Sequence, residues 1–295
     1  MSSSDHHTKP GEVGTTGHSW DGIEELNNPL PRWWLWTFYA CIAFALIYSV
    51  LYPAWPLVKG ATPGLLGYST RAAVEVEIKE YEDRNAELSS QLAAASMEDP
   101  AAIEAEPALY NYAVQGGASV FRTNCAQCHG SGAAGVQGQG YPSLLDDDWL
   151  WGGTLEDIYY TVTNGVRNED NMDARWSQMP SFGTDGLLTG GEIDQVVQYV
   201  RQISGQEHDA ALASQGETVF LDNCAACHGE DGRGDRNVGA PNLTDAIWLY
   251  GGDVATLTET VTKARFGVMP TWKERLSETE RKAVAVYVHQ LGGGE

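Results

Sequence analysis

An uninterrupted apolar stretch near the N-terminus dominates the pattern of hydrophobic and polar positions along the chain. From Trp33 to Trp55 no residue is charged, and aromatic residues gather at both ends, as they do at the two interfaces of a membrane. At about 1.5 Å per residue, a helix of this length extends roughly 35 Å, enough to cross a bilayer. The polar segment 1–32 before it is too long for a standard cleaved signal peptide. The pattern therefore predicts a membrane-anchor helix over residues 33–55.

A charged, amphipathic pattern follows the anchor. Residues 69–96 predict a helix that is polar over most of its surface, and the Ala-, Glu- and Pro-rich residues 97–108 predict a linker. We therefore expect residues 56–108 to form a helical stalk and linker between the anchor and the rest of the chain. Contact with a partner protein is the alternative role, and periodicity does not distinguish the two.

The remaining residues show helical periodicity, which predicts an all-α fold. Apolar residues recur every three to four positions in four segments, at 117–128, 154–164, 189–203 and 277–291. Each of the last two opens with Ser or Thr three residues before Glu, which resembles a capping box. Glycine- and proline-rich stretches between the segments predict loops.

The second half of the chain repeats the first. Residue i matches residue i+99 over a long ungapped stretch, which pairs residues 117–153 with 216–252. After that stretch the first copy is nine residues longer than the second. The pattern predicts two small domains, at 109–205 and 206–295, rather than a solenoid of many short repeats.

Both copies carry the motif Cys-x-x-Cys-His. The motif residues are Cys125, Cys128 and His129 in the first copy, and Cys224, Cys227 and His228 in the second. The motif is typical of c-type haem attachment, in which two thiols add to the vinyl groups of one haem and the histidine ligates the iron. The one other cysteine, Cys41, lies in the apolar stretch, so no disulfide framework remains. The sequence predicts two covalently bound haem c groups, with zinc or redox-dithiol sites as the alternatives.

Two methionines match between the copies and are candidate sixth ligands. Met179 and Met269 each precede a proline, which holds the backbone extended and presents the thioether from a loop. They lie 50 and 41 residues after His129 and His228, a difference equal to the nine-residue insertion. His with Met is the ligand pair that raises a haem potential. Because both axial positions are then filled, we expect no catalytic residue in this chain.

The alternative sixth ligands have no counterpart in the other copy. Met172 has neither a following proline nor a matching position. The remaining histidines are His6, His7 and His18 before the anchor, His208 between the copies and His289 near the C-terminus. Bis-histidine ligation is therefore the weaker prediction.

Aromatic and basic residues beyond the motifs are candidates for the walls of the haem crevices. The aromatic residues at matching positions are Trp149 with Trp248, and Trp151 with Tyr250. Core packing is the alternative role for them. Arg167 and Arg265 are candidate partners of haem propionates, but they are out of register by one position, so neither is assigned.

The net charge of −22 lies mostly beyond the anchor. Such a surface repels nucleic acid and attracts a basic protein partner at low ionic strength. Solubility of an exposed domain is the alternative explanation.

The order of helix, haem loop, helix, loop and helix in each copy resembles the small all-α fold of class I cytochromes c. One anchor, two tandem domains of this kind and paired Met-Pro ligands resemble the dihaem subunit of cbb3-type cytochrome c oxidases. The polar residues 18–34, HSWDGIEELNNPLPRWW, are similar to the juxtamembrane signature of that family. The resemblance covers about residues 17–60 and 110–292.

The resemblance implies an electron relay. Electrons would enter from a periplasmic cytochrome c or a bc-type complex. They would leave through a monohaem cytochrome c subunit to the catalytic haem–copper subunit, which reduces oxygen to water. His129 and Met179 would ligate one iron, and His228 and Met269 the other. The haem domains would be periplasmic, residues 1–32 cytoplasmic, and the anchor in the bacterial inner membrane.

Three other functions fit the haem motifs alone. They are a free-standing, membrane-anchored dihaem electron carrier, the cytochrome subunit of a periplasmic dehydrogenase, and a gas or redox sensor with an open haem position. Co-purification with haem b and copper distinguishes an oxidase subunit from the first two. Sensitivity of a haem c to carbon monoxide would identify the sensor.

Overall fold

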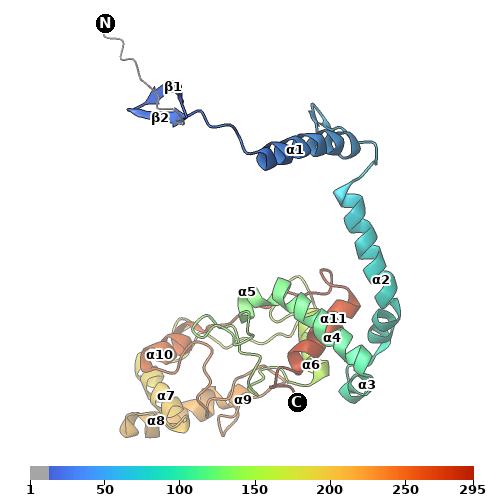
Figure 1. The fold of residues 1–295 in the computed structure, drawn as a ribbon. Helices are drawn as coiled ribbons and strands as arrows, with labels where there is room; N and C mark the ends of the chain where they lie inside the picture. The colour runs from blue at the N-terminus through green and yellow to red at the C-terminus, as the bar shows by residue number, and fades with distance from the viewer. Residues whose placement is uncertain (1–12) are drawn as a thin grey trace. The chain divides into compact units, whose positions relative to one another are not determined.

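The computed structural model describes residues 13–295 and is mostly helical, which confirms the predicted fold class (Figure 1). The chain divides between Arg84 and Asn85 into two compact units. The first unit contains the anchor helix and two short hairpins, and the second contains both haem motifs.

Helix α1, Arg32–Leu51, is the one helix within residues 13–295 that is long and apolar enough to span a bilayer. None of its side chains is buried against the rest of the described chain. The helix ends before the predicted limit at Trp55. Tyr52 adopts extended backbone, with φ −115° and ψ 163°, because it precedes Pro53.

Two hairpins lie on either side of α1, although periodicity predicted no strands. The strands are β1 (Thr15–Trp20) and β2 (Ile23–Leu26) before the helix, and β3 (Pro56–Leu57) and β4 (Gly60–Ala61) after it. Asp21 and Gly22 join β1 to β2 with positive φ at both positions, as a two-residue type I′ turn requires. This Asp-Gly pair is the local signal from which the first hairpin could have been predicted.

The second unit begins within helix α2, Thr70–Ala94, which confirms the predicted helix at 69–96. The helices that follow are α3 (Pro100–Glu104), α4 (Pro107–Val120), α5 (Ala126–His129), α6 (Leu155–Asn164), α7 (Gly190–Ile203), α8 (Ala210–Asn223), α9 (Ala225–His228), α10 (Val254–Lys263) and α11 (Glu278–His289). A π-helical turn, Phe121–Cys125, joins α4 to α5. Capping boxes start α7 and α11 as predicted, with Thr189 and Ser277 as the caps.

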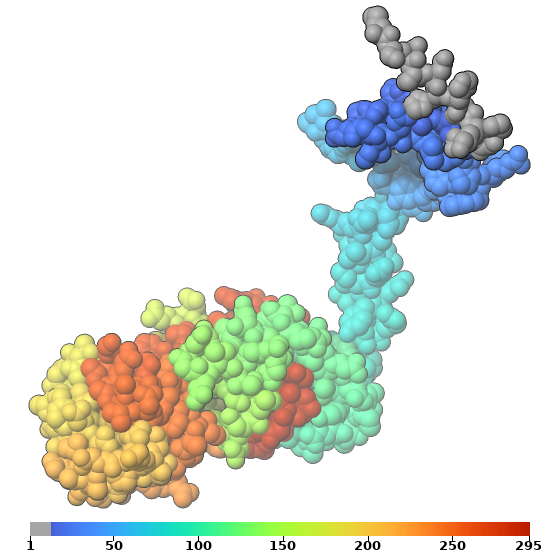
Figure 2. All heavy atoms as spheres, turned by 60° about the vertical axis from the view of Figure 1, so that its left-hand side comes forward, coloured from blue at the N-terminus to red at the C-terminus, as the bar shows by residue number. Residues whose placement is uncertain are grey.

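The two hydrophobic cores do not follow the order of the two repeats. Helix α11, from the end of the second copy, packs against α4, and α7, from the end of the first copy, packs against α8 (Figure 1). In Figure 2 the red C-terminal segment accordingly lies against the green first copy. Cluster 1 joins α4, α6 and α11, and cluster 2 joins α7, α8 and α10. The expected division into 109–205 and 206–295 therefore separates helices that share a core.

Glycines let the exchanged helices approach closely. A Cβ on Gly117 of α4 would collide with the backbone of Ala283 on α11, and a Cβ on Gly216 of α8 would collide with the carbonyl of Gln195 on α7. The aromatic pairs beside these crossings are Phe121 with Tyr287, whose ring centroids lie 5.5 Å apart, and Phe220 with Tyr199, at 5.2 Å. The same helix crossing is thus built twice, each time from both copies.

Cluster 1 also receives the C-terminal end of α2. Leu92 of α2 is fully buried in this cluster. Lys282 on α11 is buried as well, and its ammonium group donates to the carbonyl oxygens of Ala93 and Ala95. These carbonyls lie at and just beyond the C-terminal end of α2, where the helix supplies no further N–H donor, so the lysine caps it.

Candidate haem sites

The first motif lies where the π-helical turn passes into α5. Cys125 ends the turn, and Cys128 and His129 lie in α5. Nδ1 of His129 lies 3.2 Å from the carbonyl oxygen of Pro142. In the neutral ring this carbonyl fixes the proton on Nδ1 and leaves the lone pair of Nε2 for a metal. Burial lowers the pKa of His129, which favours the neutral, metal-binding form.

The second motif repeats this geometry at α9. Cys224 precedes the helix, and Cys227 and His228 lie in it. Nδ1 of His228 lies 3.1 Å from the carbonyl oxygen of Pro241, and burial lowers the pKa of this histidine too. Both imidazoles are therefore oriented by equivalent proline carbonyls.

None of the motif cysteines forms a disulfide with another described residue. The pKa of Cys125 is raised to about 11, chiefly by burial and to a smaller extent by Cys128. Burial raises the pKa of Cys224 to about 11 in the same way, with Cys227 as the smaller cause. The raised pKa values at Cys125 and Cys224 disfavour the reactive thiolates that a redox-active dithiol needs. Two thiols three positions apart, beside an imidazole with a free Nε2, fit a covalently attached haem.

The two methionines are exchanged between the copies. The residues packed on cluster 1 include Cys125 and Met269, and those packed on cluster 2 include Cys224 and Met179. This arrangement differs from the expectation that His129 and Met179 ligate one iron and that His228 and Met269 ligate the other. The reason is the helix exchange, because each methionine shortly precedes the helix that joins the other core.

The alternative ligands lie on the surface or bind elsewhere. Met172 is fully exposed to solvent. Ring nitrogens of His208 and His289 lie 2.9 and 3.0 Å from backbone carbonyls of neighbouring residues. His18 lies in β1 of the other unit, and His6 and His7 fall outside the described residues.

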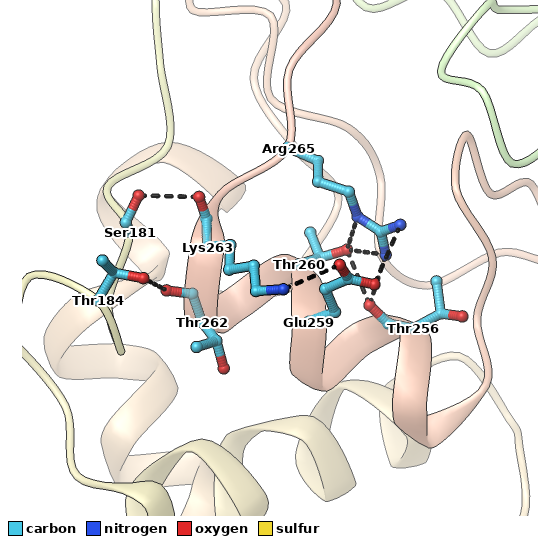
Figure 3. A network of polar contacts seen from close by, with 8 residues as sticks. All are labelled: Ser181, Thr184, Thr256, Glu259, Thr260, Thr262, Lys263 and Arg265. Carbon is cyan, nitrogen blue, oxygen red and sulfur yellow. Dashed lines mark hydrogen bonds and ion pairs between the residues drawn. The ribbon is translucent and has the colours of Figure 1, made fainter.

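The chain crosses to the other core directly after each methionine. Beyond Met179, the hydroxyl of Ser181 donates to the carbonyl of Lys263 at 2.9 Å, at the end of α10 (Figure 3). In the second copy, the hydroxyl of Thr271 donates to the carbonyl of Thr163 at 2.7 Å, at the end of α6. Each Met-Pro loop is therefore fastened to the middle helix of the opposite copy.

An arginine four residues before each methionine holds the chain to its own copy. Arg175 donates from Nε to the hydroxyl of Thr161 at 3.0 Å, and Arg265 donates from Nε to the hydroxyl of Thr260 at 3.0 Å (Figure 3). The alignment of the two copies without a gap did not reveal this pair. The nine-residue insertion lies before Arg175, so the ungapped alignment brings Arg167, rather than Arg175, close to Arg265. Counting back from the two Met-Pro pairs would have found it.

Matching aromatic residues lie against the loop that follows the motif of the opposite copy. A Cβ on Gly239 would meet the indole of Trp151, and a Cβ on Gly140 would meet the phenol of Tyr250. The indole N–H of Trp151 is buried and has no hydrogen-bond acceptor among the described residues. A haem carboxylate is an acceptor that fits such a donor. The other two predicted wall residues pack on the cores, Trp149 on cluster 1 and Trp248 on cluster 2.

Two family models match most of the chain. The model described as the N-terminal domain of cytochrome oxidase-cbb3, FixP, matches residues 12–59. The model described as cytochrome c oxidase, cbb3-type, subunit III, matches residues 113–200 and 211–288.

Relatives that align over nearly the whole chain are subunits of the same oxidase type. The chain is 65% identical over 287 residues to the cbb3-type cytochrome c oxidase subunit CcoP of Cereibacter sphaeroides, with 97% of each chain covered. It is 55% identical over 293 residues to CcoP of Rhodobacter capsulatus, with 96% of this chain and 97% of the relative covered. It is 52% identical over 284 residues to the subunit FixP of Sinorhizobium medicae, with 96% of each covered. The chain therefore belongs to the subunit III family of cbb3-type cytochrome c oxidases.

Proposed function

We propose that this chain holds two covalently attached haem c groups and relays electrons within a cbb3-type cytochrome c oxidase. The observation that supports this most directly is that each Cys-x-x-Cys-His motif shares a hydrophobic cluster with a Met-Pro pair of the other copy. We infer that His129 with Met269 ligates one iron and that His228 with Met179 ligates the other. The attachment cysteines are Cys125 and Cys128 for the first haem, and Cys224 and Cys227 for the second.

The residues of the chain bind and orient the haems and keep water away from them. The carbonyls of Pro142 and Pro241 hold the proximal imidazoles in the tautomer that ligates through Nε2. Met179 and Met269 would each bind an iron through the thioether sulfur, from positions packed against the apolar clusters. When bound, each haem supplies a one-electron redox centre whose His–Met ligands raise its potential. Two protein ligands on each iron would favour electron transfer over reaction with oxygen.

The direction of the relay follows from the partners. Electrons enter from a periplasmic cytochrome c or a bc-type complex and pass through the monohaem cytochrome c subunit to the catalytic haem–copper subunit. The net charge of −22 supports a basic donor, because opposite charges speed encounter, and it disfavours nucleic acid. Helix α1 anchors the chain in the bacterial inner membrane, with residues 1–32 cytoplasmic and the haem-bearing residues 109–295 periplasmic.

Co-purification with haem analysis tests this proposal. An affinity-tagged full-length chain, isolated in mild detergent, should bring haem b and copper with it and should carry two covalent haems. The double variant Cys224→Ala, Cys227→Ala is the matched control and should retain one. A tagged chain that emerges without haem b and copper contradicts the oxidase role, and a single haem on the unaltered chain contradicts the dihaem assignment.

A further inference from the structure

The nine extra residues of the first copy place one arginine between the two Met-Pro loops. In the second copy a single residue, Ala264, separates α10 from Arg265. In the first copy α6 ends at Asn164, and the longer segment that follows contains Arg167, which has no counterpart. Arg167 has φ 49°, in the left-handed region that disfavours residues with a side chain. Contacts around it must therefore hold this conformation.

The guanidinium group of Arg167 binds both loops at equivalent positions. Its Nε donates to the carbonyl oxygen of Gly267 at 2.7 Å, and its Nη1 donates to the carbonyl oxygen of Ser177 at 3.1 Å. Gly267 lies two residues before Met269, and Ser177 lies two residues before Met179. One side chain thus joins the two segments immediately before each crosses to the opposite core.

The backbone beneath this side chain is held from both sides as well. Val166 exchanges two backbone hydrogen bonds with Met269, each of 3.0 Å. The N–H of Arg167 donates to the carbonyl of Arg175 at 2.8 Å. The backbone at Val166 and Arg167 is therefore bonded directly to the Met269 loop and to Arg175, four residues before Met179.

The chemistry of the group suits a rigid clamp. A guanidinium is planar, stays charged and presents its donors in a fixed fork, so two bonds constrain the angle as well as the distance. Bonds from a charged donor are stronger than those between neutral groups. Burial lowers the pKa of Arg167 from its ordinary value, and the nearby Tyr250 opposes this effect.

We propose that Arg167 is a positioning residue for both axial methionines, so that ligation at the two irons depends on one side chain from the insertion. This inference rests on the ligation by Met179 and Met269 proposed above. Arg175 and Arg265 differ from it, because each hydrogen-bonds within its own copy, to α6 and α10 respectively.

The test uses the full-length, haem-loaded chain and the weak far-red absorption band that a methionine sulfur gives when it ligates ferric haem. The variants Met179→Ala and Met269→Ala calibrate the band, since each should remove about half of its amplitude if each methionine serves one of two irons. If neither variant lowers the amplitude, the proposed ligation fails, whatever the arginine variants show.

Arg167→Gln should then remove more than half of the amplitude, because both loops lose their clamp. Arg265→Gln is the matched control and should remove no more than half, since its bonds hold the second copy alone (Figure 3). With the calibration in place, an unchanged band in Arg167→Gln overturns the inference. A loss no larger than that in Arg265→Gln overturns it as well.

Arg167→Lys distinguishes the role of the planar guanidinium from that of its positive charge. It also provides the test if the Arg167→Gln protein does not accumulate. Lysine keeps the positive charge but has no planar fork. We expect this variant to retain two covalent haems and to lose part of the band. Recovery of the full unaltered amplitude would show that charge alone is required, and it would overturn the clamp.

Discussion

The two cores are built on the same plan. They differ in the contacts made by the last helix of a copy, which is α11 in cluster 1 and α7 in cluster 2, on the side that faces away from the core. On α11 of cluster 1, Lys282 is buried and caps the end of α2. The position that matches it on α7 of cluster 2, counted from the capping residue, is Asp194, which is exposed. One repeat unit has therefore been adapted to receive the stalk, whereas the other presents the same face to solvent. The difference indicates that the residues of the motif regions and the residue that holds the stalk helix α2 are separate.

The largest expected effect concerns the methionine exchange, by which each core combines the motif of one copy with the methionine of the other. In the Cys224→Ala, Cys227→Ala background the first motif alone retains a haem. There, Met269→Ala should abolish the far-red methionine band, whereas Met179→Ala should leave it in place. Absorption spectra of the oxidised protein measure this, and the opposite pattern would restore the pairing within each copy.

The next effect sharpens the comparison of the two helix crossings. Gly117→Ala should lower the free energy of unfolding by about 1–3 kcal/mol, because its Cβ would collide with the backbone of Ala283. Gly116→Ala is the control, since its Cβ would lie 3.9 Å from the side chain of Ala283, an ordinary contact. Alanine is also the better helix former there, by about 1 kcal/mol. Urea unfolding followed by circular dichroism should separate the two variants, and equal midpoints would contradict the close crossing.

A smaller effect tests the stalk attachment itself. Lys282→Met should lower the free energy of unfolding by about 1–2 kcal/mol, because two helix-end carbonyls lose their donor. The loss stays modest, since Ala93 and Ala95 are half-buried and water can reach them. Hydrogen exchange should quicken over residues 92–97. Asp194→Met, at the exposed matching position, should change neither quantity, and an equal effect there would remove the distinction between the cores.

The smallest effect concerns a carboxyl group between the copies. The pKa of Asp148 is raised to about 6, chiefly by burial and next by the charge of Asp245 in the other copy. Because the unfolded pKa is about 3.9, the folded state holds more protons between these values, and stability falls as the pH rises from about 4 to 6. The shift corresponds to roughly 3 kcal/mol at most, and partial exposure reduces it to about 1 kcal/mol.

Asp148→Asn should therefore raise the free energy of unfolding at pH 8 and leave it nearly unchanged at pH 4. Denaturation at the two pH values measures this. Asp147→Asn, at an exposed neighbouring position, is the control. Equal effects of the two variants at pH 8 would show that general surface charge, rather than the buried site, is responsible.

Local chemistry was predictable from the sequence, because it depends on residues close together in the chain. The Cys-x-x-Cys-His spacing, the Met-Pro pairs and the helical periodicity each act within a few positions. The helices at 69–96 and 189–203, with their charged face and capping box, appear as predicted. Even the missed β1–β2 turn carried a local signal, in Asp21 and Gly22.

The exchange was not predictable in the same way. Each copy contains a complete set of patterns, so pairing within a copy and pairing between copies satisfy the same periodicity. The choice depends on long-range packing, such as Gly117 against α11, which no local pattern reports. Arg167 illustrates the same limit, because its role follows from two carbonyls that lie 10 and 100 residues away in the chain.

The crossing of the two copies has a consequence for biosynthesis and for evolution. Met269 and α11 leave the ribosome well after the first motif, yet they complete the core around it. The core around the first motif cannot close until α11 of the second copy has been translated. A premature stop within the second copy would therefore damage the core around the first motif. Once a duplicated gene has reached this state, deletion of either copy removes part of the core around the motif that remains.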